Sequence, residues 1–168
     1  MEYWIYITGG LAVLTNFIAY RAGTINKYRV IAALALAFLS LHFFLQEALA
    51  GAIGIGIGAI RNLVAVRYTN RLVLVVFVAA TLGFCLWEWL YLHNPVSLFI
   101  AYASALIFTV GAIVLTHVQA IRRWFIVAEL LGLLYAFIVG SGLGMLFNLS
   151  NLTSIVTKMR SEQQSKTE

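Results

Sequence analysis

The stretch that decides the fold is SLHFFLQEALAGAIGIGIGAIRNLVAVRYTNR, residues 40–71. An apolar segment ends at Gln46 and Glu47, and a glycine-rich apolar segment then leads to a patch with three arginines. Each glycine would cost a water-exposed helix about 1 kcal/mol relative to alanine. In a membrane, small residues instead let neighbouring helix backbones approach closely. The stretch therefore predicts a tightly packed transmembrane hairpin with a basic foot on the cytoplasmic side.

The composition extends this reading to the whole chain. Of 168 residues, 62% are hydrophobic and only 10% are charged, which is too apolar for the surface of a soluble domain of this size. A transmembrane helix needs about 20 apolar residues, fewer in short spans. We therefore expect an all-α polytopic membrane protein with seven transmembrane helices. The expected spans are 3–20, 30–46, 50–66, 72–92, 96–117, 124–140, and a last one that follows GSGLG and ends near residues 158–160.

The charges predict the orientation of these spans. When the N-terminus is placed outside, all eleven Lys and Arg fall on the cytoplasmic side or in the tail, whereas Glu2, Glu47 and Glu88 fall outside. This sorting follows the positive-inside rule and predicts an N-out, C-in topology. The basic residues form short groups between apolar runs and no basic face, so the expected partner is the lipid bilayer and no nucleic acid. Residues 1–160 are expected as one transmembrane domain, and residues 161–168 as a disordered cytoplasmic tail.

The chain also carries a candidate internal repeat. A shift of 93 residues aligns several basic and small residues: Arg29 with Arg122, Gly51 with Gly144, and Arg67 with Arg160. The expected halves are residues 3–68 and 96–160, joined by a linker helix at 72–92. A single linker helix leaves both halves in the same orientation, which is a parallel 3+1+3 repeat.

Polar residues within apolar spans are costly, so they are the first candidates for function. Glu129 has Gly132 and Gly140 on its helical face and is expected to point at a helix interface or cavity, as a proton-linked group or an acceptor for solute. The alternative is a structural ion pair with Arg122, Arg123 or another cytoplasmic arginine. The expected substrate-path residues are Asn16, His42, Gln46, Glu129, Tyr135, Asn148 and Asn151, and the expected helix-packing residues are Gly51, Gly54, Gly58, Gly132, Gly140 and Gly144.

The other polar candidates also have structural alternatives. Asn148 and Asn151 belong to a polar stripe on the last helix, which either lines a solvated path or makes interhelical hydrogen bonds, and Asn16 has the same two readings. His42 lies four residues before Gln46 and is either a proton switch or a side chain satisfied by a nearby backbone or hydroxyl group.

Catalytic residues are not expected. The sequence shows no Ser-His-Asp or Cys-His arrangement. A pair of catalytic carboxylates is not expected either, because Glu129 is the only carboxylate deep within a span. His93 and His117 stand in other segments than His42, and Cys85 is the single cysteine, so we expect no metal site and no cofactor.

Two short motifs resemble a known family. The segment from Leu41 to Leu45 with Gly51, followed by Arg61, Asn62 and Arg67, resembles the bacterial inner-membrane YgjV family, and the segment from residue 148 to 160 is similar to its closing helix. The resemblance covers nearly the whole chain. It implies a multi-pass protein of the bacterial inner membrane and brings no catalytic or binding residues.

More distantly, the 3+1+3 plan with the N-terminus outside is similar to that of SWEET and PnuC transporters. This chain lacks their proline-glutamine pair, since its only proline, Pro95, precedes Val96. Any hinge would therefore have to use glycine. These observations predict a transporter or facilitator for a small polar solute. The alternative is a non-transport membrane protein, such as a receptor, an assembly factor or a partner-binding subunit, and a homo-oligomer is left open.

Overall fold

A computed structural model describes residues 2–19, 21–115 and 117–164, and all regular structure in these ranges is helical. The seven α-helices are α1 (Glu2–Ala19), α2 (Ile25–Leu45), α3 (Leu49–Val64), α4 (Arg71–Trp87), α5 (Leu98–Val114), α6 (Val118–Ile138) and α7 (Gly142–Gln164). A single π-helical turn, η1 (Glu88–Leu92), continues α4. The prediction of an all-α chain with seven helices is confirmed.

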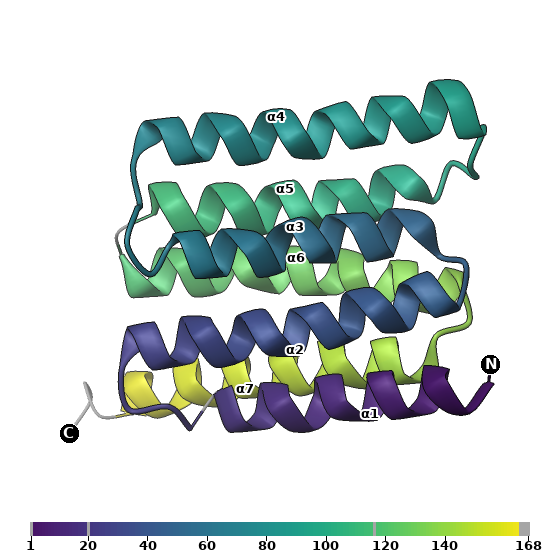
Figure 1. The fold of residues 1–168 in the computed structure, drawn as a ribbon. Helices are drawn as coiled ribbons and strands as arrows, with labels where there is room; N and C mark the ends of the chain where they lie inside the picture. Colours follow the sequence, from purple (N-terminus) through teal and green to yellow (C-terminus); the bar gives the residue numbers. More distant parts are fainter. Residues whose placement is uncertain (1, 20, 116, 165–168) are drawn as a thin grey trace.

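The helices run up and down in an antiparallel bundle (Figure 1). We call the end at which α1, α3, α5 and α7 finish the basic end, because Arg21, Lys27, Arg67 and Arg71 lie there. The opposite end carries Glu2, Glu47 and Glu88 and is called the acidic end. Helix α1 begins at the acidic end and α7 finishes at the basic end, so the two charge groups predicted from the sequence are separated along the bundle.

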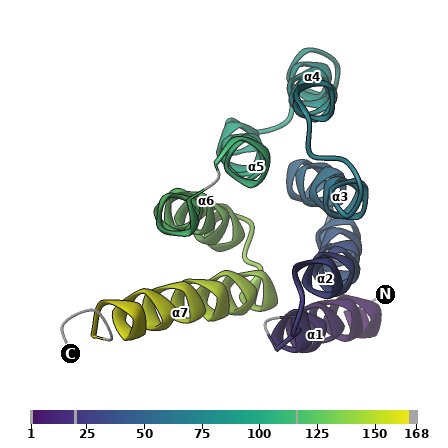
Figure 2. The same cartoon turned by 90° about the vertical axis from the view of Figure 1, so that its left-hand side faces the viewer.

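The helices form two arms joined through α4. Helix α2 packs on both α1 and α3, which makes arm 1 (α1–α3), and α6 packs on both α5 and α7, which makes arm 2 (α5–α7). Figure 2 shows the arms splayed from each other, with α4 where they converge and α7 leaning toward α1. Contacts of α3 with α5 and of α1 with α7 close the ring.

Small residues form much of the helix interfaces. The buried core combines alanines with a few large side chains: Ala12, Ala35, Ala52, Ala101, Ala136, Leu39, Phe43 and Tyr102. Small side chains let helix backbones approach closely, so packing itself can hold such helices together. The outward faces are apolar and exposed, and Phe137 and Leu72 are examples at 69% and 70% exposure.

Two helices begin earlier than predicted. The expected starts at residues 30 and 124 are corrected to Ile25 for α2 and Val118 for α6. The nearby basic residues were taken as loop, but Thr24 caps α2 by accepting a hydrogen bond from the Lys27 amide (3.3 Å). Long basic side chains can remain on a helix and extend toward water, so they do not mark its end.

The last helix is longer than predicted. Helix α7 continues to Gln164, beyond the expected end near residues 158–160. Glutamate and glutamine are good helix formers, and no proline or glycine interrupts this segment. The rest of the predicted tail, residues 165–168, lies outside the described residues.

Candidate functional site

A cavity of about 630 Å³ lies between the two arms. Its lining reaches the basic end at the exposed residues Gly23, Thr24 and Lys158. Its inner part is lined by the buried residues Gly51 and Tyr135. This volume is in the range of sites that hold small molecules. The cavity is therefore lined by exposed residues at the basic end and by buried residues toward the acidic end.

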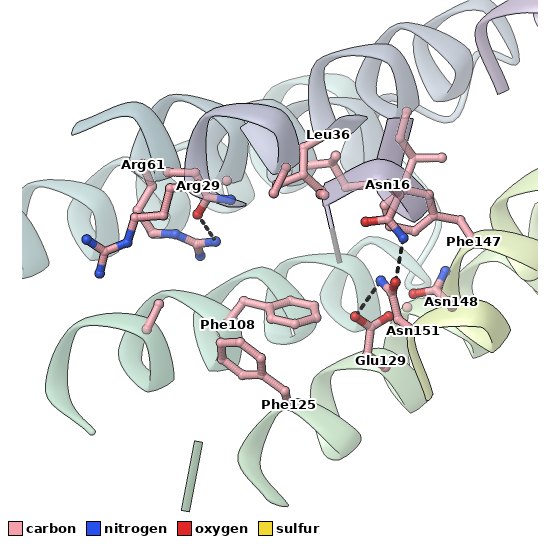
Figure 3. Close-up of a pocket in the computed structure, with 18 of the residues that line it drawn as sticks. Asn16, Arg29, Leu36, Arg61, Phe108, Phe125, Glu129, Phe147, Asn148 and Asn151 are labelled. Carbon is pink, nitrogen blue, oxygen red and sulfur yellow. Dashed lines mark hydrogen bonds between the residues drawn. The ribbon is translucent and has the colours of Figure 1, made fainter. Parts of the chain in front are cut away.

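A chain of three buried polar side chains crosses the cavity wall. Asn16 of α1 donates from Nδ2 to Oδ1 of Asn151 (2.6 Å), and Asn151 donates from Nδ2 to Oε1 of Glu129 (2.8 Å). All three side chains are at most 5% exposed. Figure 3 shows the chain running from α1 through α7 to α6. It connects the two arms and places a carboxyl group beside the pocket.

Glu129 is buried in α6, and its carboxyl oxygen Oε1 accepts a hydrogen bond from the Asn151 amide (2.8 Å). The alternative of a structural pair with Arg122, Arg123 or another cytoplasmic arginine stays a prediction. A carboxyl group held by one amide retains acceptor capacity that faces the pocket.

Asn148 lies on the same wall. Its amide donates to the Gly144 carbonyl of its own helix (2.8 Å). A Cβ added at Gly132 would come within 2.5 Å of the Asn148 side-chain oxygen, so only glycine lets this side chain lie against α6. Gly132 of α6 thus lies against a polar side chain of α7.

Aromatic residues close the inner end of the pocket. The hydroxyl of Tyr135 accepts a hydrogen bond from the Gly51 amide (3.1 Å), and its ring packs on Phe43 with 5.8 Å between centroids. Tyr135 is 5% exposed and Phe43 is 1% exposed. Gly51 and Phe43 belong to arm 1 and Tyr135 belongs to arm 2. This contact therefore holds the arms together at the inner end of the cavity.

Two predicted path residues lie outside the pocket, in the acidic half of the bundle. His42 bonds through Nδ1 to the Ile5 carbonyl and through Nε2 to the Ser141 hydroxyl, both at 2.8 Å. Gln46 is the C-terminal cap of α2, and its Oε1 is buried without a partner. His42 therefore joins helices α1, α2 and the start of α7, and neither residue lines the cavity. Asn16, Glu129, Tyr135, Asn148 and Asn151 do line it.

Three of the six predicted packing glycines, Gly51, Gly132 and Gly144, are at contacts too close for a Cβ, and Gly54 and Gly58 are at ordinary contact distance. A Cβ at Gly51 would lie 2.5 Å from the Tyr135 ring, and one at Gly144 would lie 2.7 Å from Phe43; Gly54, Gly58 and Gly132 also have neighbours within 4 Å. Gly140 is a correction, because nothing lies within 4 Å of the Cβ position there. Its φ of +70° shows why: α6 ends at Ile138, and Gly140 forms the left-handed turn that follows.

One functional candidate was missed from the sequence. Arg61 was counted with the basic foot, yet it is only 5% exposed and lines the cavity. Its Nη1 donates to the Thr109 hydroxyl and its Nη2 to Asn62, both at 3.1 Å. Thr109 is 48 positions away in the chain, so only the packing of α3 on α5 reveals that this arginine is inside the protein.

Ligands for a metal ion are not gathered in the described part of the chain, where no three His, Cys, Asp or Glu side chains cluster. The expectation of no metal and no cofactor stays a prediction. The site consists of amides, one carboxyl group, hydroxyls, aromatic rings and cationic side chains, which together can bind a polar solute.

An all-α bundle with apolar outer faces belongs with membrane proteins. Among the described residues, α2 and the segment Arg71–Leu92 are long and apolar enough to cross a bilayer, and α3 and α5 are apolar but shorter. A family model described as Imp-YgjV, bacterial inner membrane protein, matches residues 3–165. The chain belongs to this family, as its motifs predicted. No curated protein and no solved structure matches the chain.

Proposed function

We propose that this protein is a multi-pass carrier of the bacterial inner membrane that moves a small polar solute through the pocket between its arms. The observation that carries this proposal is the cavity of about 630 Å³, which reaches the basic end and contains buried Asn16, Asn151 and Glu129. Buried polar groups in a membrane bundle are costly unless they face partners or a solvated path. A pocket between two helical repeats is also where transporters place their sites.

A parallel repeat is supported by the helix bounds. Both bounds of α2 (Ile25–Leu45) return 93 residues later in α6 (Val118–Ile138), and the start of α3 at Leu49 returns at the start of α7, Gly142. The same shift had aligned Arg29 with Arg122 in the sequence. With α4 as the linker, the proposed plan is 3+1+3, with arm 1 and arm 2 as the two repeats.

The turns at the acidic end support the repeat independently. Glu47 (φ 60°) and Gly140 (φ 70°) are left-handed residues that stand 93 positions apart. The following amides make matching bonds: Ala48 donates to the Phe43 carbonyl (2.9 Å), and Ser141 donates to the Ala136 carbonyl (2.8 Å). The two turns are thus the same local structure built from different residues.

Seven crossings with the N-terminus outside are part of the proposal. Large apolar side chains on the outer faces are exposed on helices throughout the bundle, including Leu14, Leu34, Leu63, Val75, Phe99, Leu130 and Leu146. Such a surface suits lipid rather than water. Short helices such as α3 are accommodated by tilt or by local thinning of the bilayer. The positive-inside rule then places the basic end in the cytoplasm, so the pocket opens inward.

Solute-driven swelling of proteoliposomes tests the carrier function. The probes are glycerol, erythritol, alanine, succinate and phosphate, with protein-free liposomes as the baseline. We expect at least one probe to enter faster with wild-type protein, and Asn148→Leu and Glu129→Gln to remove that excess. Ser150→Ala is the matched control, because Ser150 bonds to the Phe147 carbonyl of its own helix (2.8 Å) and does not line the pocket. Baseline rates for every probe, or equal rates in all variants, would contradict the proposal.

A further inference from the structure

Arg61 carries a buried charge that is not paired with any carboxylate in the described part of the chain. It is 5% exposed, and its recorded partners are the hydroxyl of Thr109 and the side-chain oxygen of Asn62. Its Nε is buried and has no hydrogen-bond partner. A guanidinium group has five N–H donors, so two hydrogen bonds leave most of this group unsatisfied. No carboxylate of the described residues pairs with it.

An unpaired buried cation is costly in a membrane protein, so such a residue is a candidate for anion binding. The planar guanidinium group suits carboxylate and phosphate oxygens, which it can bind through two parallel N–H groups. Thr109 and Asn62 hold the Nη atoms in place and leave Nε available. The side chain is therefore oriented in advance for an oxyanion.

The surrounding charges favour the same ligand. Of the described residues that line the pocket, Arg29, Arg61, Arg122 and Lys158 are cationic and Glu129 is the one acidic residue. Figure 3 shows Arg29 and Arg61 at one side of the pocket, and Glu129 with Asn148 and Asn151 at the other. Glu129 bonds to Asn151 at the side of the pocket opposite Arg61. The pocket is thus positive at one side and rich in amides at the other.

We propose that the pocket binds a small soluble organic anion, whose carboxylate or phosphate group contacts Arg61 and whose polar remainder reaches Asn151 and Glu129. This names the solute class of the proposed carrier and rests on that function only for the transport step. An anionic lipid headgroup has the same oxyanion chemistry. The soluble anion is favoured because the pocket is reached from the basic end between the arms, where the lining includes Gly23, Thr24 and Lys158.

Binding is tested on the purified full chain in a neutral detergent. Intrinsic fluorescence of its four tryptophans follows thermal unfolding while succinate or inorganic phosphate is titrated against chloride at constant ionic strength. We expect a saturable rise in Tm for wild type, a Kd at least about tenfold weaker in Arg61→Gln, and a smaller loss in Arg61→Lys, since lysine keeps the charge without the planar fork. Arg67→Gln is the matched control, because Arg67 is an exposed arginine outside the pocket and should bind like wild type.

A second variant fills the pocket and keeps the charge. A Cβ at Gly58 would lie at ordinary contact distance from Arg61 Nη2 (3.8 Å) and Leu36 Cδ1 (3.7 Å), so Gly58→Leu adds bulk beside the guanidinium group without a clash at Cβ. We expect this variant to fold and to lose anion binding. It keeps the proposal testable if Arg61→Gln yields no folded protein.

A further measurement with lipids distinguishes a soluble anion from a lipid headgroup as the source of the oxyanion. Mixed micelles with phosphatidylglycerol are compared with micelles that contain phosphatidylcholine. A rise in Tm with phosphatidylglycerol alone, and with neither soluble anion, would overturn the proposal, as would equal anion binding in wild type and both Arg61→Gln and Gly58→Leu. Anion binding that depends on Arg61 in a protein without solute flux would uphold this site and reject the carrier. Flux of glycerol or alanine without anion binding would uphold the carrier and reject the anion site.

Discussion

The amide of Gly51 donates a hydrogen bond to the hydroxyl of Tyr135 over 3.1 Å, and this bond joins α3 of arm 1 to α6 of arm 2. The donor is in the first turn of α3, where backbone N–H groups have no partner within the helix. Tyr135 thus satisfies a buried amide and closes the inner end of the pocket with one side chain.

Removal of the Tyr135 hydroxyl should weaken the contact between arm 1 and arm 2 and so destabilise the fold. Tyr135→Phe keeps the ring on Phe43 but leaves the Gly51 amide unsatisfied, which should cost roughly 1 kcal/mol. The measurement is the unfolding midpoint in detergent, with Tyr91→Phe as a control because Tyr91 is 74% exposed. Equal midpoints for wild type and Tyr135→Phe would show that the bond is not formed in solution.

A methyl group at Gly51 should be more harmful than the loss of the hydroxyl. A Cβ there would lie 2.5 Å from the Tyr135 ring and 3.3 Å from Phe43, so Gly51→Ala must move α3 or the ring. We expect a loss of about 1–3 kcal/mol, or a lower yield of folded protein by size-exclusion chromatography. Gly10→Ala on α1 is the comparison, since nothing lies within 4 Å of its Cβ, and it should not destabilise the fold. A neutral Gly51→Ala would mean that the arms are further apart at this end.

The two left-handed turns predict substitutions of opposite sign. Glu47 has φ 60° and is exposed, so Glu47→Gly should relieve backbone strain and stabilise the fold by about 1 kcal/mol. Gly140→Ala should destabilise it by a similar amount, because an L-residue at φ 70° is strained even where space is free. Thermal unfolding of both variants checks this, and a change of the same sign in both would contradict it.

The polar chain predicts a larger effect for Asn151 than for Asn148. Asn151→Ala leaves both Asn16 and Glu129 without their hydrogen-bond partner, at a cost of about 1–3 kcal/mol. Asn148→Ala removes a bond to its own helix only and should cost less. A double-mutant cycle of Asn16→Ala with Asn151→Ala measures the coupling across the arms, and strictly additive effects would show that these amides do not interact.

Membrane orientation can be checked with single cysteines in a Cys85→Ala background. Asn26 at the basic end and Val96 at the acidic end are both exposed positions. In intact cells, a membrane-impermeant maleimide should label Val96→Cys and leave Asn26→Cys unlabelled until the membrane is opened. The reverse labelling pattern would place the basic end outside the cell, and the pocket would then open outward.

The number of helices and their approximate positions were predictable because they depend on hydrophobic length and on the charges between apolar runs, both of which are local. The first residues of the helices were less predictable, since Lys27 and Arg29 were taken as loop although Thr24 caps the helix before them. Contacts between residues distant in the chain were the hardest to predict. The sequence placed His42 near the outer end but could not show that Ile5 and Ser141 take both of its ring nitrogens.

The role of Arg61 could not be predicted from the sequence either. An arginine near the end of an apolar helix is usually a topological signal, and the residue next to it, Asn62, is polar as well. What makes it a candidate ligand residue is its contact with Thr109 on another helix and a buried Nε that no described residue satisfies. Neither property has a signature in the local sequence.

The attachment of α4 decides where the molecule can flex. Glu88, which is fully buried, accepts hydrogen bonds from Tyr102 of α5 and from Asn94 (2.8 Å), and Trp89 packs on Phe99 with 5.0 Å between ring centroids. Helix α4 packs less extensively on α3. The connection of α4 to arm 2 through Glu88 and Trp89 is therefore stronger than its connection to α3. If the arms separate, we expect α4 to stay with α5 and the chain to bend in the short segment 65–70 rather than in the proline-containing turn at residues 93–97.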